Sequence, residues 1–167
     1  MKPILLTKGM IAIVDDDDWE LLEQYQWYYS THNRAYTTTH ISCKTENGKR
    51  TTKSRHIPMT HMILGITDSR IVDHKNGETL DNRKENLRIC TNRQNSANSK
   101  LRKDSKSGYK GVSFNKNAKK WSSQIKVNYE RIYLGIYDTP WKAAQAYDDA
   151  AVKYFGEFAK LNNVYQG

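Results

Sequence analysis

Four polar residues in the middle of the chain have types and spacings that suit cleavage of a phosphodiester. They are Asp73, His74, Asn86 and Asn95. Hydrolysis of such a bond needs a nucleophilic water, a base that takes its proton, and stabilisation of charge on the phosphate and the leaving oxygen. A divalent metal can supply that stabilisation. One carboxylate, one imidazole and two amides could together build a compact, metal-assisted site of this kind.

Each of these side chains suits one task. Histidine titrates near physiological pH, so a neutral His74 suits the base. Asp73 offers the hard anionic oxygen that Mg²⁺ prefers, and Asn95 can add a neutral amide oxygen. Two protein ligands leave positions for waters and the scissile phosphate. Asn86 is placed in the sequence to hydrogen-bond either His74 or the loop, and so to hold the orientation of the imidazole.

A plainer interpretation exists for the same residues. Asp-His followed by Asn-Gly occurs in many surface loops, and Asn86 can simply cap a turn. His61 is a further candidate for a contact with phosphate or substrate, or else a helix histidine packed near the core. Spacing alone leaves both interpretations open.

Local signals place the four residues on a hairpin followed by a helix. The expected elements are a strand at Ile71–His74, turns at Asn76-Gly77 and Asp81-Asn82, and a return strand at Leu87–Cys90. Thr91-x-x-Gln94 is a capping box, which predicts a helix that begins at Asn92 and carries Asn95 and Asn98 one turn apart on one face. A β-β-α unit of this kind would bring the site residues together where strand end and helix start converge.

Residues 1–64 are typical of a mixed α+β module. The expected elements are strands at Ile11–Val14, Trp27–Tyr29 and Ala35–Ser42, a helix around Trp19–Tyr25, and a second short helix that Pro58 opens and that includes His61. The acids Asp15–Asp18 suit a helix N-terminus. A cation-binding loop is the alternative, although calcium loops space their ligands at alternate positions.

Positive charge is concentrated in the last part of the chain. The formal net charge is +9. Residues 1–98 carry 14 basic and 12 acidic side chains, whereas residues 99–167 carry 13 and 6. This imbalance indicates an anionic partner for the C-terminal part, with a merely well-solvated surface as the alternative. Residues 99–107 form a basic, serine-rich linker, and Lys103 in it suits a phosphate backbone.

Residues 108–162 predict three strands covered by one helix. Trp121–Val127 and Arg131–Tyr137 alternate apolar and polar residues, as in an antiparallel sheet with one wet face. In the second of these strands Ile132, Leu134 and Ile136 form the apolar face, which leaves Arg131, Tyr133 and Tyr137 on the other. Thr139 as N-cap, Pro140 at the first position and Gly156 at the end bound the covering helix, in which the positions expected under the sheet are Ala144, Tyr147, Ala151 and Tyr154. The uncovered face should then display Ser113, Asn115, Gln124, Lys126, Arg131 and Tyr133. Such a face is shaped for the major groove of DNA, with Lys110 as a further DNA contact.

Two cysteines and the overall hydropathy bear on the compartment. Cys43 and Cys90 lie far apart without a C-x-x-C pair, so we expect plain thiols in a reducing cell interior. No apolar run is long enough to span a bilayer and no signal-peptide pattern follows Met1. We therefore expect a soluble, intracellular protein that binds no membrane.

Part of the chain resembles a known nuclease family. The stretch V-D-H-K-N-G-x-x-x-D-N-R-x-E-N-L-R-x-x-T-x-x-Q-N closely resembles the HNH, or ββα-metal, endonucleases of phage introns and free-standing homing genes, over about residues 57–98. The resemblance implies that Asp73 and Asn95 hold one divalent metal, that His74 is the general base and that Asn86 supports the site. Asn95 stands where many members have histidine, which favours Mg²⁺ or Mn²⁺ over zinc.

A second resemblance covers most of residues 108–163. Y-K-G-V, W-S-S-Q-I-K, Y-L-G-I-Y-D-T, A-A-Q-A-Y-D-D-A-A and F-G-E-F-A-K-L-N are similar to the Apetala/ethylene-response-factor DNA-binding domain. That family places its three-stranded sheet in the major groove. Ser113 and Asn115 stand at positions that are arginine in plant members, and Tyr133 stands where tryptophan is usual. Docking in the major groove is therefore expected, but not the plant target sequence.

The sequence as a whole predicts an α+β protein. We expect residues 1–98 to hold the N-terminal module and the nuclease core, residues 99–107 to link, and residues 108–163 to bind double-stranded DNA. The expected activity is a metal-dependent, site-preferring DNA endonuclease, which leaves 5′-phosphate and 3′-hydroxyl ends. It should nick as a monomer, or cut both strands through dimerisation on DNA or successive nicks. The alternatives are a DNA-binding transcription regulator without catalysis, and a nuclease for RNA or structured DNA. A phage-encoded protein would act in the bacterial cytoplasm.

Overall fold

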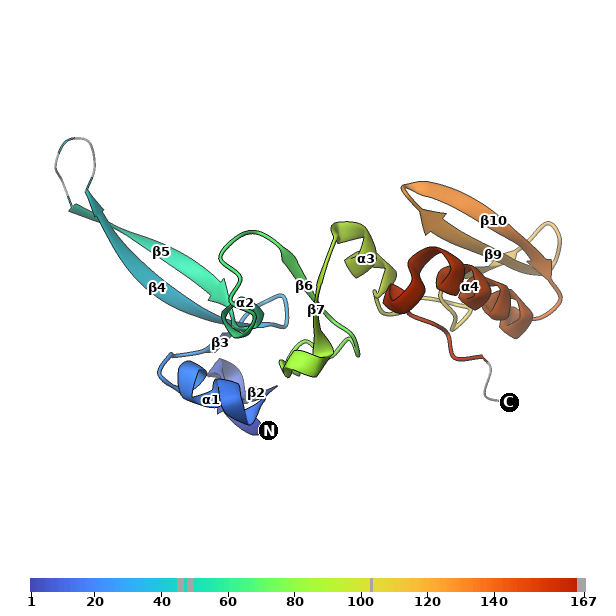
Figure 1. The fold of residues 1–167 in the computed structure, drawn as a ribbon. Helices are drawn as coiled ribbons and strands as arrows, with labels where there is room; N and C mark the ends of the chain where they lie inside the picture. The colour runs from blue at the N-terminus through green and yellow to red at the C-terminus, as the bar shows by residue number, and fades with distance from the viewer. Residues whose placement is uncertain (45–46, 48–49, 103, 165–167) are drawn as a thin grey trace. The chain divides into compact units, whose positions relative to one another are not determined.

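The chain folds into mixed α+β structure, as predicted (Figure 1). The structure, a computed structural model, describes residues 1–44, 47, 50–102 and 104–164. The chain divides into two compact units, Met1–Cys90 and Thr91–Gly167. The domain limits expected at residues 98 and 107 stay predictions, since they were drawn on motifs rather than on compactness.

The first unit contains three small antiparallel sheets. They comprise β1 (Lys2–Leu5) with β2 (Ile11–Val14), β3 (Tyr28–Tyr29) with β4 (Ala35–Lys44) and β5 (Arg50–Pro58), and β6 (Ile71–His74) with β7 (Leu87–Cys90). The helical segments are η1 (Thr7–Gly9), α1 (Asp16–Glu23), α2 (Met59–Ile63) and η2 (Lys84–Asn86). The predicted strands at 11–14, 71–74 and 87–90 are confirmed.

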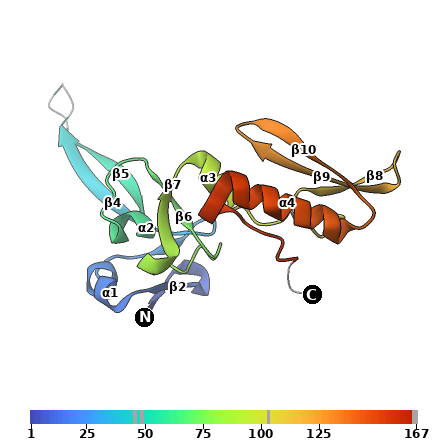
Figure 2. The same ribbon diagram turned by 45° about the vertical axis from the view of Figure 1, so that its right-hand side comes forward.

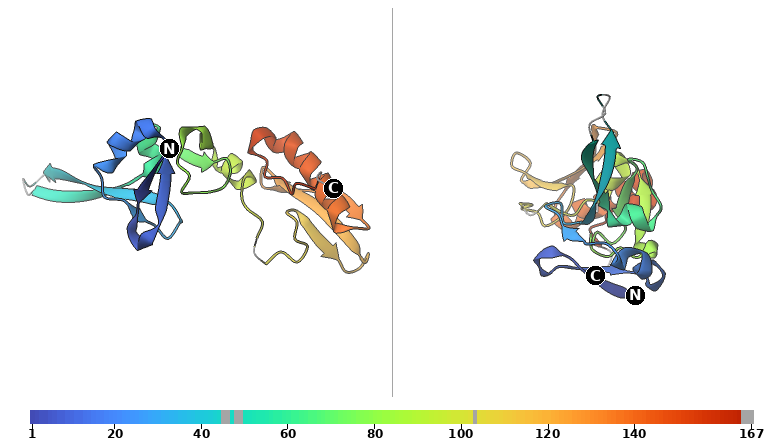
Figure 3. Two further views of the ribbon diagram at one scale, coloured as in Figure 1. Left: turned by 90° about the horizontal axis from the view of Figure 1, so that it is seen from below. Right: turned by 90° about the vertical axis from the view of Figure 1, so that its left-hand side faces the viewer.

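Other expectations for this unit need correction. The strand predicted at Trp27–Tyr29 starts one residue later, because Trp27 is buried and its indole Nε1 donates to the Leu22 carbonyl at 2.8 Å. Pro58 is the N-cap of α2 and the last residue of β5, not the first helical residue. β5 itself was not expected. It pairs along its length with β4 to form a long ribbon (Figures 1 and 3).

One apolar core unites the elements of the first unit. Its buried members are Ile4, Leu6, Ala12, Val14, Leu22, Trp27, Ala35, Met59, Ile63, Ile66, Val72 and Leu87. Val72 comes from β6 and Leu87 from β7, so the β6–β7 hairpin is anchored in the same core as the N-terminal strands. Burial of such side chains stabilises the unit by roughly 1.5–3 kcal/mol each.

The acids at the start of α1 bind a loop of the same unit. Asp16, Asp17 and Asp18 lie in the first turn, as suits the helix dipole. The side chain of Asp15, however, makes no cap hydrogen bond to its own helix. Its Oδ2 accepts from the Lys84 backbone N–H at 2.8 Å, and Asp18 pairs with Lys84 Nζ at 2.7 Å. These acids therefore attach the segment around η2 to α1.

The second unit is a three-stranded sheet covered by a helix, preceded by a short helix. Its elements are α3 (Asn92–Ala97), β8 (Val112–Asn115), β9 (Lys120–Val127), β10 (Glu130–Tyr137), α4 (Pro140–Phe155) and η3 (Gly156–Phe158). The antiparallel sheet has the order β10-β9-β8, and α4 lies along one face of it (Figure 2). The predicted caps are confirmed: Thr139 accepts from Lys142 N, Pro140 begins α4, and Gly156 ends it with φ +53°.

A register shift in β10 overturns part of the expected alternation. Ile132 pairs with Ile125 on the covered face, but the register shifts between Tyr133 and Gly135. As a result Ile136 pairs with Ser122 on the open face and is 39% exposed, while Tyr137 packs against the buried Ala143 and Ala144. Such a bulge moves every later side chain to the other face.

The covering face of α4 also differs in one position from the expectation. Ala144, Tyr147 and Ala151 are buried, as predicted, whereas Tyr154 is 41% exposed. Ala143 and Ala150 are buried in the same core clusters, and the buried carboxylate of Asp148 accepts from Asn162. Small alanines let helix and sheet approach closely.

Two further expectations concern compartment. Among the described residues, no helix is long and apolar enough to cross a lipid bilayer. Cys90 is buried at the end of β7, and the side chain of Cys43 lies outside the described residues.

The close approach of β8 to α4 gives a stability test. An alanine at Gly111 would place its Cβ inside the ring of Tyr147 and 2.8 Å from the Gln124 carbonyl oxygen. Gly108 has a similar φ, +73° against +77°, but open space around the added Cβ. We expect Gly111→Ala to lower the free energy of unfolding by about 3 kcal/mol or more through overpacking, and Gly108→Ala by only about 1 kcal/mol. Chemical denaturation measures both, and equal losses would contradict the packing account.

Candidate active site

The β6–β7 hairpin carries three of the four predicted site residues. Its register pairs Asp73 with Arg88 and His74 with Leu87. Successive side chains of a strand point to opposite faces, and directly opposed residues share a face. Asp73 and Arg88 therefore lie on one face of the hairpin, and His74 lies with Leu87 on the other, which meets the core.

His74 is buried and its imidazole is held by one side chain. The residue is 2% exposed, and Nε2 lies 3.2 Å from Asn82 Oδ1. The Asn82 amide donates through Nδ2 to the Leu80 carbonyl at 3.3 Å, which fixes its oxygen toward the ring. Since Oδ1 can only accept, His74 Nε2 carries the proton, and the lone pair of the neutral imidazole lies on Nδ1.

The surroundings of His74 favour the neutral imidazole. Burial lowers the pKa of His74 below its usual value, and the hydrogen bond that His74 Nε2–H donates to Asn82 partly offsets this by raising it. The charge of Arg34 lowers the same pKa, while Asp73 and Asp81 raise it. Because burial is the largest of these effects, His74 is neutral at pH 7 and able to accept a proton.

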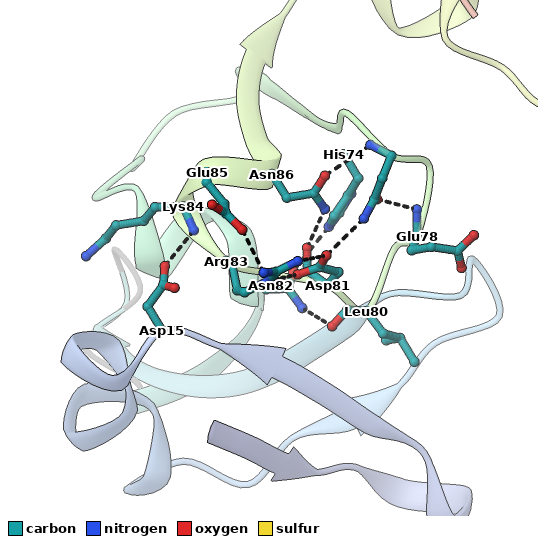
Figure 4. A network of polar contacts seen from close by, with 11 residues as sticks. Asp15, His74, Glu78, Leu80, Asp81, Asn82, Arg83, Lys84, Glu85 and Asn86 are labelled. Atoms are coloured by element: carbon teal, nitrogen blue, oxygen red, sulfur yellow. Dashed lines mark hydrogen bonds and ion pairs between the residues drawn. The ribbon is translucent and has the colours of Figure 1, made fainter. Parts of the chain in front are cut away.

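Asn86 holds the loop between the two strands. It is 6% exposed; its Oδ1 accepts from the Asn76 backbone N–H at 3.0 Å, and its Nδ2 donates to the Asp81 carbonyl at 2.7 Å (Figure 4). Of the two partners expected for Asn86, His74 or the loop, these bonds go to the loop. Asn86 thus acts on His74 through the loop that carries Asn82.

The loop is further cross-linked and tied to β2. Arg83 pairs with Asp81 at 2.8 Å and with Glu85 at 2.6 Å (Figure 4). The Arg83 guanidinium holds the pKa of Asp81 below its usual range. The backbone of Ile13 in β2 accepts from Asn82 N and donates to the Leu80 carbonyl, both at 2.8 Å. The position of Asn82 is therefore fixed from both sides.

Asp73 is in a buried ion pair. Arg88 donates to Asp73 Oδ2 through Nε at 3.0 Å and through Nη2 at 2.8 Å, with the side chains 10% and 7% exposed. Two charges this far from water are held because each neutralises the other. Any metal that binds Asp73 must share the carboxylate with Arg88 or displace it.

Asn95 lies on α3, in the second unit. The predicted capping box is present: Thr91 Oγ1 accepts from Gln94 N at 3.3 Å, and Gln94 Oε1 accepts from Thr91 N at 2.8 Å. Asn95 is half-buried, and Asn98 is the buried C-cap. Asp73 belongs to the first unit, so its approach to Asn95 stays a prediction.

His61 is a half-buried residue of α2. Its Nδ1 lies 3.4 Å from Thr60 Oγ1. Burial lowers the pKa of His61, and a hydrogen bond with the backbone of Arg70 raises it. Both effects describe a histidine packed against its own unit, and its contact with substrate stays a prediction.

The predicted DNA-facing residues share the open face of the second unit's sheet. The register pairs Ser113 with Ser122, Gln124 with Tyr133 and Lys126 with Arg131, all on the face away from α4. Tyr133 is 61% exposed, and Lys126 and Arg131 are exposed cations. Asn115 is on this face, but its Oδ1 accepts from the backbones of Asn117 and Ala118 and so shapes the β8–β9 turn.

Lys110, a further lysine expected on DNA, contacts the end of α3. Lys110 Nζ donates to the carbonyls of Ala97 at 2.6 Å and Ser99 at 2.9 Å. Burial lowers the pKa of Lys110 to about 8. Its ammonium is thus engaged with the end of α3, and a phosphate contact by Lys110 stays a prediction. Lys103 lies outside the described residues.

The comparisons identify both parts of the chain. Residues 55–97 match the HNH endonuclease model. A protein of Acanthamoeba polyphaga mimivirus, named as an uncharacterized HNH endonuclease, is 32% identical over 94% of this chain and 77% of its own length. The chain belongs to the HNH endonuclease family. The metal and the homing role that the resemblance implied stay proposals.

Residues 107–157 of this HNH endonuclease family member match the AP2 domain. An AP2-like ethylene-responsive transcription factor of Arabidopsis thaliana is 45% identical over 35% of the chain, and an ethylene-responsive transcription factor of the same plant is 50% identical over 34%. The chain spans only 12% and 31% of these two proteins. The likeness is therefore one of a domain, and it implies DNA as a partner.

Sequence reasoning missed three residues of the candidate site. Asn82 was seen only as part of a turn signal, and nothing in its spacing indicates the bond to His74. Arg88 could have been found, because pairing the two predicted strands in register sets it opposite Asp73. Arg34 gives no such signal, since it precedes β4 and reaches His74 only through the fold.

The bond between Asn82 and His74 predicts a loss of stability on mutation. Asn82→Ala leaves the buried imidazole N–H without its acceptor, so we expect the free energy of unfolding to fall by about 1–3 kcal/mol. Urea denaturation measures this loss. Asn76→Ala is the control, because it removes an exposed amide of the same loop. If both variants lose the same free energy of unfolding, the bond from His74 to Asn82 does not stabilise the protein.

Proposed function

We propose that the protein is a metal-dependent DNA endonuclease that hydrolyses phosphodiesters to 5′-phosphate and 3′-hydroxyl ends. The observation that carries the proposal is His74, buried and neutral, with its lone pair directed to Nδ1 by Asn82. Such a group is a ready base. The family match supports the same reaction class.

His74 takes the proton of the attacking water. As the water oxygen bonds to phosphorus, its proton passes to Nδ1 and the bond from phosphorus to the 3′-oxygen breaks. The leaving oxygen gains a proton and becomes the 3′-hydroxyl. Nδ1 is buried, so the attacking water must enter beside it before the transfer. Asn82 holds the ring through Nε2, and Asn86 holds the loop that carries Asn82.

The residues present fit a hard divalent ion, Mg²⁺ or Mn²⁺. Asp73 supplies a carboxylate and Asn95 an amide oxygen, the donors that such ions prefer. Arg88 donates to Oδ2 of Asp73, and a carboxylate has about four lone-pair sites, so Arg88 and an ion can share it. When bound, the ion stabilises charge on the phosphate and the leaving oxygen. Within the described part of the chain, no three His, Cys, Asp or Glu side chains gather into a stronger site.

The open sheet face positions the enzyme on double-stranded DNA. Lys126, Arg131 and Tyr133 combine charge with an aromatic ring on one surface, which suits a groove lined by phosphates. Ile136, which the register shift brings to this face, adds an apolar contact of the kind that thymine methyl groups accept. One site per chain favours nicking by a monomer, with double-strand cutting left to a dimer on DNA or to successive nicks.

A regulator that binds DNA without cutting is the second candidate. The observation in its favour is the Asp73–Arg88 ion pair, which occupies a proposed metal ligand. A regulator of this kind would bind DNA tightly without metal and would cleave neither strand. Intron homing, host defence and competition between phages all remain compatible with the enzyme.

A supercoiled-plasmid assay tests the function. We expect nicking with Mg²⁺, none with EDTA, and a loss of about 10²–10⁴-fold in His74→Ala, with DNA binding retained. An intact plasmid despite tight binding would establish the regulator instead, and cleavage of a structured RNA in place of the plasmid would reassign the substrate.

The pH profile of nicking tests the base separately. His74 acts only when neutral, and its pKa is lowered. Activity should therefore be level at neutral pH and fall in acid, with a midpoint below 6.5. A midpoint above that value would exclude the buried imidazole as the base.

The Asp73–Arg88 pair predicts a metal-linked change in stability. Arg88→Met leaves the Asp73 carboxylate buried without its cation, so we expect a loss of about 3–5 kcal/mol in the metal-free protein. Mg²⁺ then binds the native state more tightly and should raise the melting temperature of the variant more than that of the natural protein. Arg83→Met, which frees Asp81 instead, is the control. An equal Mg²⁺ effect in all three proteins would show that Arg88 and the ion do not compete.

A further inference from the structure

Helix α3 carries Asn95 of the nuclease motif, yet it is held by the DNA-binding module. At its C-terminal end, Lys110 Nζ donates to the carbonyls of Ala97 and Ser99 at 2.6 and 2.9 Å. Helix C-termini leave such carbonyls without intrahelical partners and favour a cation. Lys110 thus satisfies the end of α3 from a residue just before β8.

Lys110 is itself fixed to α4. Its backbone N–H donates to Asn162 Oδ1 at 2.7 Å, and its carbonyl accepts from Asn162 Nδ2 at 3.1 Å. Asn162 donates through its backbone N–H and its side chain to Asp148, which is 0% exposed on α4, at 2.9–3.0 Å. The chain of bonds from α3 therefore ends in the core of the second unit.

The N-terminal end of α3 is attached to the tip of the β9–β10 hairpin. Arg93 Nη1 donates to Asn128 Oδ1 at 3.0 Å, and its guanidinium lies 5.5 Å from the centre of the Tyr129 ring. Both turn residues have positive φ, 51° for Asn128 and 70° for Tyr129. A tyrosine seldom adopts this conformation. Its ring is 76% exposed, and Lys126 lies over it as well, so the strained turn presents an aromatic ring to two cations.

A helix as short as α3 depends on these contacts. It has six residues, too few to be stable alone in water. Ala97 and Asn98 are buried at its end, and the helix packs near α4 and η3. The helix is therefore held by the sheet module at both ends.

We propose that Arg93 and Lys110 are positioning residues, which make α3 a rigid part of the DNA-binding module and so set Asn95 at a fixed place relative to the sheet. The inference rests on the proposed function, in which Asn95 is a metal ligand. The sequence that the sheet binds would then fix the phosphate that is cut. Loosening α3 should scatter the nicks and weaken the response to metal, while the sheet still binds DNA.

The test compares Arg93→Gln and Lys110→Met with Lys153→Met. Each variant loses one positive charge, and Lys153 is exposed on α4, where its Nζ lies over the Tyr154 ring. On plasmid DNA with Mg²⁺, nick positions are mapped by primer extension, the half-saturating Mg²⁺ concentration by titration, and affinity by gel shift.

We expect Arg93→Gln to bind DNA like the control, and the gel shift of Lys110→Met reports separately on the predicted phosphate contact of Lys110. Both variants loosen α3. Their nicking should fall by about 10-fold or more, as for small misplacements of a catalytic group, with nicks spread over neighbouring phosphates and a higher Mg²⁺ requirement. Natural nick positions, rates and Mg²⁺ dependence in Arg93→Gln would overturn the proposal. If Lys110→Met loses DNA binding through misfolding, the exposed Arg93→Gln decides alone.

Failure of the proposed function gives a different result. The natural protein would then leave the plasmid intact under all conditions. Hydrogen exchange still tests whether Arg93 and Lys110 hold α3 in place. We expect the α3 amides to exchange faster in Arg93→Gln and Lys110→Met than in Lys153→Met, with α4 amides unchanged. Equal α3 protection in all three would overturn it.

Discussion

A buried imidazole must have a hydrogen-bond partner, and much of the first unit follows from supplying one to His74. Its acceptor, Asn82, lies on a loop rather than on a strand, and loops seldom hold a side chain still. Three contacts therefore hold the loop. Asn86 donates to the Asp81 carbonyl, Arg83 forms an ion pair with Asp81, and the backbone of Ile13 in β2 bonds the loop backbone. The N-terminal strands and α1 thus help to fix the loop that holds His74.

The same need explains the acids of α1. Asp15 and Asp18 could have capped their own helix, but both reach Lys84 beside η2. Each such contact near the surface is worth little by itself. Together with the core positions Val72 and Leu87, they restrict the hairpin on which Asp73 and His74 stand. In the proposed mechanism their orientation matters, because a base must face the attacking water within a narrow angle.

The helix caps could be predicted from local sequence, whereas features that depend on the register of distant strands could not. The caps at Thr91 and Thr139 depend on residues three positions away, so the sequence displays them directly. Ile136 was assigned to the wrong face because a bulge at Tyr133–Gly135 breaks a period that looks regular in the sequence. β5 was missed because its lysines, threonines and arginines show no alternation, and its pairing is set by β4. The Asp73–Arg88 pair follows once the two predicted strands are paired end to end, a step beyond the spacing of the motif.

The two functions of the chain meet in residues 91–98. By motif this segment belongs to the nuclease, because it supplies Asn95; by packing it belongs to the sheet module, because Arg93 and Lys110 hold it there. A freely hinged pair of domains would bind at one place and cut over a range of places. With Asn95 as the proposed metal ligand, its attachment to the binding module through Arg93 and Lys110 would narrow that range. Specificity of cutting can then arise from specificity of binding, without base contacts by the nuclease hairpin itself.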